Sequence, residues 1–105
     1  MLHTMMKISV AALTALVCAA SVAQASNVFA GKKIYEQHCQ RCHGDHGIPI
    51  LPGSPDFSKG DGLHVTDRKL FSAIKAGKNV MPAYNKVISE RDILNVVAYI
   101  RTLWR

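Results

Sequence analysis

Hydrophobic side chains recur at helical spacing near the end of the chain. The stripe there comprises Ile93, Val96, Val97, Ile100 and Trp104. The residues expected on the opposite face are Arg91, Asn95, Thr102 and Arg105. This spacing predicts an amphipathic helix. Ser89 precedes the stripe as a candidate N-cap, and Asp92 lies three residues later in a capping-box-like position.

Two further helices are predicted upstream. Asn27 can cap a first helix that runs to about His38. Thr66 can cap a short helix that ends at Gly77, and its apolar positions are Leu70, Phe71 and Ile74. No stretch shows strand alternation of useful length. We therefore expect an all-α domain of three main helices.

Long loops separate these helices. Residues 44–65 contain five Gly and three Pro, and such a composition favours turns. A second loop contains Lys78, Asn79, Val80, Met81 and Pro82. Long loops are unusual in a domain of this size, and they indicate that the chain wraps around a bound group.

The first 25 residues have the pattern of a secretory signal peptide. A weakly basic start precedes an apolar stretch from Ile8 to Ala23 and the small-x-small sequence Ala23-Gln24-Ala25. A permanent membrane helix is the competing interpretation, but the apolar stretch is shorter than the ~20 residues that cross a bilayer. We expect cleavage after residue 25, no stable membrane span afterwards, and a periplasmic domain of residues 26–105 in a Gram-negative-type bacterium.

The expected mature domain is small and basic. Because Lys7 lies in the signal segment, residues 26–105 carry 12 Lys and Arg against 7 Asp and Glu, a net charge of +5. This surplus suits an acidic protein partner or an anionic membrane face. Scattered basic residues and few aromatic ones do not fit nucleic-acid binding. A chain of about 80 residues buries too little apolar surface to be comfortably stable, so we expect a cofactor in its core.

The sequence Cys39-Gln40-Arg41-Cys42-His43 has the spacing of a c-type haem attachment site. Two thiols at this spacing can bond the two vinyl groups of haem, and the adjacent histidine becomes the proximal iron ligand. A zinc site would need a second ligand pair, which the sequence lacks. A thioredoxin-like pair belongs near a βαβ pattern, and a plain disulfide leaves His43 unexplained. The motif therefore predicts one covalently bound haem c.

Met81 is the candidate for the second iron ligand. It is the only methionine of residues 26–105, and Pro82 restricts the backbone beside it. A thioether opposite an imidazole raises the reduction potential of haem iron. Ordinary packing is the alternative role for Met81. Among the histidines, His64 lies in a loop and can also reach the iron, whereas His46 is only three residues from His43 and is badly placed to do so.

These features resemble the class I c-type cytochromes, in particular small bacterial monohaem members. The motif through Gly44 and the pair Met81-Pro82 match that family, as does Gly31-x-x-x-Tyr35 in the first helix with Val96-x-x-Tyr99 in the last. The resemblance implies the cytochrome c fold, in which these helices cross closely. It also implies that a proline carbonyl accepts a hydrogen bond from the proximal histidine, with Pro49 as the first candidate and Pro52 as the second. Three further residues are candidates either for lining the pocket or for ordinary packing: Phe57, Leu63 and Tyr84.

The function expected from these features is transfer of single electrons. No residue suggests a general acid or base beside an open iron site, so we expect no enzyme activity. Lysines near the methionine loop, Lys78 and Lys86, and on the first helix, Lys32 and Lys33, can steer an acidic redox partner. We expect a monomer. Two alternatives stay open: a subunit dedicated to a periplasmic reductase or dehydrogenase, of the nitrite reductase or alcohol dehydrogenase type, and an open-site haem that binds gases or reduces peroxide.

Overall fold

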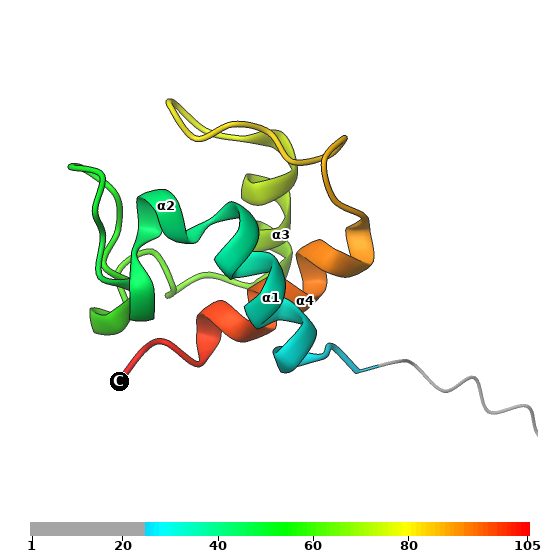
Figure 1. The fold of residues 1–105 in the computed structure, drawn as a ribbon, viewed down its shortest axis with the longest axis horizontal. Coiled ribbons are helices and arrows are strands. Elements are labelled where there is room, and N and C mark those ends of the chain that lie inside the picture. Colours follow the sequence, from blue (N-terminus) through cyan, green and yellow to red (C-terminus); the bar gives the residue numbers. More distant parts are fainter. Residues whose placement is uncertain (1–24) are drawn as a thin grey trace, which may run out of the picture.

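The computed structural model describes residues 25–105, and its regular structure is helical (Figure 1). The three main helices are α1 (Val28–His38), α3 (Asp67–Ala76) and α4 (Glu90–Arg101). Three short helical turns complete the set: α2 (Gln40–His43), η3 (Asp45–Gly47) and η4 (Phe57–Lys59). Within the described part, β-pairing is limited to an isolated bridge between Lys78 and Met81. The prediction of an all-α domain with three main helices is confirmed.

The predicted signal segment lies outside the described residues, except for Ala25. Across residues 25–105, no helix is both long enough and apolar enough to span a bilayer.

The helix starts follow the local signals in the sequence. The side chain of Asn27 accepts a hydrogen bond from the amide of Ala30 at the start of α1, at 3.0 Å. Thr66 caps α3 through the amide of Lys69. At α4, Ser89 and Asp92 form a complete capping box, in which each side chain accepts from the other residue's amide. Each cap satisfies amides that the first helical turn leaves without partners.

Helices α1 and α4 pack closely together at Gly31. A Cβ atom on Gly31 would lie 2.0 Å from the backbone oxygen of Asn95, so a larger residue cannot fit without separating the helices. Beside this contact, the rings of Tyr35 and Tyr99 pack with centroids 5.2 Å apart. The expected close crossing of the first and last helices is confirmed.

The expectation for Asn95 is wrong, because this residue lies at the crossing of α1 and α4. This residue was expected on the polar, solvent-facing side of the last helix, but it is buried, with 6% of its surface exposed. Its Oδ1 atom accepts a hydrogen bond from the amide of Asn27 at 2.9 Å. A polar side chain tolerates burial here because the start of α1 supplies a donor.

The expected apolar stripe is also wrong at its end. Helix α4 ends at Arg101, and the turn that follows buries Leu103 (4% exposed) in place of Trp104 (42% exposed). The indole of Trp104 instead covers Gly60, where a Cβ atom would lie 2.3 Å from a ring carbon, and meets the ring of His64 edge-on. The helical period therefore stops one turn before the predicted end.

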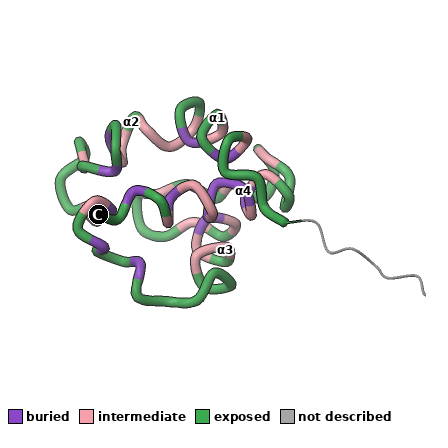
Figure 2. The backbone as a smooth tube through the Cα atoms, turned by 90° about the horizontal axis from the view of Figure 1, so that it is seen from below, coloured by how far each residue is buried: buried purple, intermediate pink, exposed green. Residues whose placement is uncertain are grey.

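The core is concentrated along α4 and the inner face of α1, whereas the loops are largely exposed (Figure 2). Buried residues of α4 are Ile93, Asn95, Val96, Val97 and Ile100. Two loops extend from this helical base: residues 47–55, green at the left of Figure 1, and residues 77–83, yellow at its top. Residues of both loops line the cavity described below, together with side chains of α3 and α4.

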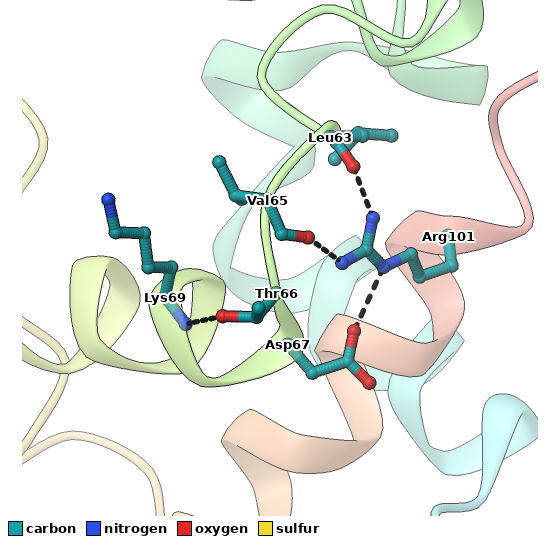
Figure 3. A network of polar contacts seen from close by, with 6 residues as sticks. All are labelled: Leu63, Val65, Thr66, Asp67, Lys69 and Arg101. Atoms are coloured by element: carbon teal, nitrogen blue, oxygen red, sulfur yellow. Dashed lines mark hydrogen bonds and ion pairs between the residues drawn. The ribbon is translucent and has the colours of Figure 1, made fainter.

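Arg101 at the end of α4 fixes the segment that enters α3 (Figure 3). Its guanidinium donates to the backbone carbonyls of Leu63 and Val65 and, at 2.9 Å, to the carboxylate of Asp67. A guanidinium suits this role because its planar set of donors can bind several oxygens at once. The loop before α3 is thereby joined to the last helix.

Candidate cofactor-binding site

A cavity of about 590 Å³ lies among the haem motif, the 51–57 loop, α3 and the methionine loop. The lining from the motif side is His38, Cys39, Cys42 and His43. Facing residues come from the methionine loop: Lys78, Asn79, Val80, Met81, Pro82 and Tyr84. Apolar side chains of the helices complete it: Leu70, Ala73, Ile74 and Ile100. Its size falls in the range of cofactor sites, about 300–1,000 Å³.

Both cysteines of the motif line this cavity. Cys39 closes the end of α1, and Cys42 lies on α2, one short turn later. Both are free thiols, and burial, followed by the nearby Cys42, raises the pKa of Cys39 to about 11. The structure thus brings two thiols, three residues apart in the chain, to the lining of one cavity.

His43 is held beside the thiols at the end of α2. Its ring stacks on that of Phe57, with centroids 4.9 Å apart and planes 16° from parallel. Burial lowers the pKa of His43, so its imidazole is neutral at neutral pH. The neutral imidazole is the form that binds a metal.

The Nδ1 atom of His43 is buried and has no hydrogen-bond partner in the structure. The hydrogen bond that His43 was expected to donate to the carbonyl of Pro49, or of Pro52, is therefore not formed here. Of the two prolines, Pro52 lines the cavity. A buried imidazole nitrogen without a hydrogen-bond partner lowers the stability of the folded protein. A group that binds the Nε2 atom of His43 would leave Nδ1 still without a partner.

Met81 also lines the cavity, and a tight turn places it there. Lys78 and Met81 exchange two backbone hydrogen bonds, of 2.9 and 3.0 Å, and Asn79 between them has a φ of 56°. At the base of the turn, Gly77 lies so close to Met81 and Ala83 that a Cβ atom would be 2.8 Å from their backbone atoms. The turn holds the half-buried methionine against the cavity.

Some of the remaining candidate residues line the cavity, and others do not. Phe57 and Tyr84 line the cavity, whereas Leu63 belongs to the buried core. His64 meets Trp104, and His46 is exposed beside Asp45, its ring 3.6 Å from that carboxylate. Neither of these two histidines lines the cavity.

Some residues that line the cavity were not predicted from the sequence. His38 was interpreted as a helix residue, yet it lines the cavity and meets the ring of Tyr84 edge-on, with centroids 6.1 Å apart. The inner face of α3 was identified as an apolar stripe, but its periodicity does not distinguish contact with a cofactor from contact with other side chains. For His38 the available signal was its position directly before Cys39.

The residues present fit a haem. Two free thiols and a neutral imidazole share one wall, a thioether lies in the facing loop, and the space between is lined mainly by apolar side chains. Exposed Leu51 and Val80 also line the cavity, so one of its edges opens to solvent.

This helical base, with its Cys-x-x-Cys-His motif against an apolar cavity, has the construction of a small class I c-type cytochrome. Residues 26–100 match the family described as "Cytochrome C oxidase, cbb3-type, subunit III", and the chain belongs to this family of c-type cytochrome domains. Its fold is the cytochrome c fold, its cofactor is covalently attached haem c, and its activity is haem-based electron transfer.

Individual relatives agree with this assignment. Cytochrome c6 of Gracilaria tenuistipitata var. liui is 32% identical over 80 residues, which are 72% of each chain. The crystal structure of cytochrome c6 from the diatom Phaeodactylum tricornutum has a TM-score of 0.64 and 28% identity, over 73% of this chain and 93% of that one. The CcoP subunit of the cbb3-type oxidase of Azospirillum sp. (strain B510) is 29% identical over 77% of this chain, but the match spans 30% of CcoP.

Proposed function

We propose that the chain is a periplasmic carrier of single electrons whose haem iron is bound by His43 and Met81. The observation that supports this proposal is that His43 and Met81 both line one mainly apolar cavity, together with the two thiols. The haem supplies the redox chemistry, exchanging one electron with partner proteins. Cys39 and Cys42 would attach it through their sulfur atoms, and Pro52 or Pro49 would orient His43 once the site is filled.

The surroundings of the cavity support transfer rather than catalysis. Methionine in the sixth position would leave no open coordination site for a substrate. Apolar walls keep water away, while the solvent-facing edge at Leu51 and Val80 offers a short path to a partner. Lys78 lies at this cavity, and exposed Lys86 follows it in the chain, so an acidic docking face on the partner is favoured. We further propose that the carrier is a monomer and that residues 1–25 direct its export.

Replacing Met81 tests the proposal directly. Ferric wild-type protein should show the weak red charge-transfer band of sulfur-bound iron. Met81→Ala should remove the band, lower the reduction potential and allow ferrous protein to bind carbon monoxide readily. Met81→His should lower the potential but keep the iron low-spin, because imidazole favours ferric iron more than a thioether does. A wild type that lacks the band and binds carbon monoxide rapidly would instead indicate an open-site haem or ligation by another residue.

A dedicated role within an oxidase or dehydrogenase is the second candidate, favoured by the match to an oxidase subunit. The same electron-transfer site would then serve one partner enzyme. Measured electron-transfer rates with several purified acceptors separate the two roles: a general carrier reduces several of them, and a dedicated one reduces a single acceptor.

A further inference from the structure

The methionine loop is joined by its backbone to one wall of the cavity. The amide of Tyr84 donates to the carbonyl of Ile74 at 3.1 Å, and the amide of Asn85 donates to that of Lys75 at 3.2 Å. Both acceptors lie in α3. Together with the two Lys78–Met81 bonds, these contacts fix the loop to α3 and to itself. None of these bonds joins the loop to the segment that carries the haem motif.

The side chain of Tyr84 makes such a connection. Its hydroxyl donates to the backbone carbonyl of His38 at 3.0 Å, across 46 residues of chain, and its ring meets the His38 ring at 72°. His38 ends α1 and directly precedes Cys39. A tyrosine hydroxyl is protonated at neutral pH, and burial raises the pKa of Tyr84 further, so the hydroxyl remains a donor.

The tip of the loop is exposed to solvent. Val80, beside Met81, is 81% exposed, and Pro82 and Ala83 are exposed as well. A loop that is held at its base and exposed at its tip can open without unfolding the helices below it. Opening would carry Met81 away from the cavity, and the bond from Tyr84 to His38 opposes this motion.

We propose that Tyr84 is a positioning residue, which holds Met81 at the iron by tying the methionine loop to the carbonyl of His38. This inference rests on the proposed ligation by Met81. It assigns to Tyr84 a role distinct from lining the pocket: the hydroxyl sets how often the sixth position opens, while the ring contributes packing.

Tyr84→Phe tests this role, because phenylalanine keeps the ring against His38 and removes the donor alone. The matched control is Tyr99→Phe, which removes a hydroxyl from a half-buried tyrosine that packs on Tyr35 and does not line the cavity. Val97→Ala serves as a second control, since it weakens the buried core and leaves the Tyr84 hydroxyl in place. All variants are compared as holoproteins.

The measured quantities are the rate of carbon monoxide binding to ferrous protein and the midpoint pH at which the ferric charge-transfer band is lost. Carbon monoxide can bind only when Met81 has left, so its rate reports loop opening. Tyr84→Phe should bind carbon monoxide about five-fold faster, the factor expected for the loss of one net hydrogen bond. Its band should also disappear at a lower pH, while both controls should match the wild type.

Two results would overturn the inference while leaving Met81 ligation intact. One is a wild type with the band whose carbon monoxide rate and band midpoint are unchanged by Tyr84→Phe. The other is an equal acceleration in Val97→Ala, which would trace the effect to general loss of stability. If the wild type has no band at all, the proposed ligation fails, and the inference fails with it.

Discussion

Gly31 lies directly against the backbone oxygen of Asn95, leaving 2.0 Å for any Cβ atom placed there. This contact sets the separation of α1 and α4. Since α1 leads into Cys39 and α4 supplies Ile100 to the cavity, the same contact positions two parts of the haem site. The crossing of the helices and the shape of the cavity are therefore linked.

Gly31→Ala should lower the free energy of unfolding. At an open helix position this change stabilises by about 1 kcal/mol through helix propensity. Here the added methyl group must separate α1 from α4, and overpacking of this kind typically costs about 1–3 kcal/mol. Denaturant unfolding of the holoprotein measures the net effect. Lys33→Ala, at an exposed position of the same helix, should change stability by less than about 0.5 kcal/mol. An increase in stability for Gly31→Ala would show that the crossing can relax.

Haem attachment should depend on both thiols. Cys39→Ala or Cys42→Ala should abolish or severely reduce holoprotein formation. Each residue lines the cavity and would supply one of the two sulfur atoms that attach the haem. Extraction of the wild type with acid acetone should leave the haem on the polypeptide. Haem that moved into the organic phase would contradict covalent attachment.

Removing the cofactor should unfold most of the domain. A cavity of about 590 Å³ between loops leaves a chain of this size without enough buried apolar surface to offset its backbone entropy, roughly 1–2 kcal/mol per residue. Circular dichroism of the Cys39→Ala/Cys42→Ala double variant should show little helix. A cooperative thermal transition with native-like helix content would be inconsistent with coupling between folding and haem binding.

Arg101 offers a test of how the loop before α3 is held. Arg101→Ala leaves the carbonyls of Leu63 and Val65 without this donor and should cost about 1–3 kcal/mol in unfolding free energy. Asp67→Asn removes the exposed ion pair while leaving those bonds, and should cost less than about 1 kcal/mol. Equal losses in the two variants would assign the effect to the ion pair instead.

The features of the fold that were predicted correctly from the sequence are those that depend on neighbouring residues alone. Asn27, Thr66 and Ser89 were identified as caps because capping requires a particular side chain within three residues of the helix start. The haem motif was found for the same reason: the chemistry of attachment fixes its spacing. Such features need no knowledge of distant contacts.

The predictions were wrong where contacts between distant segments of the chain determine the position of a side chain. Asn95 looked like a surface residue of an amphipathic helix, but it is buried because the start of α1, 68 residues away in sequence, provides its donor. Trp104 fits the helical period, yet it turns outward to cover Gly60 once the helix has ended. The Tyr84–His38 bond likewise joins two segments that no local pattern connects.

A last prediction concerns the buried hydroxyl of Tyr35, which donates to the carbonyl of Gly44 at 2.6 Å, one residue beyond His43. Burial raises the pKa of Tyr35 well above its ordinary value of 10.0, followed by smaller contributions from Cys39, Tyr99 and Asp45. The Cys39 contribution is absent once that sulfur is bonded to haem, but burial, the largest cause, persists.

The direction of the pH dependence follows from this shift. In the unfolded chain Tyr35 loses its proton near pH 10, whereas in the folded protein it keeps the proton to higher pH. Its contribution to stability is therefore complete below pH 10 and declines as the pH rises beyond that value. Tyr35→Phe should cost about 1 kcal/mol at pH 7, because it removes one net hydrogen bond. Above pH 10 the difference between wild type and variant should shrink, since the variant has no proton to lose. Denaturant midpoints measured from pH 7 to 11 will show the two curves converging; curves that stay parallel would mean that Tyr35 ionises alike in the folded and unfolded states.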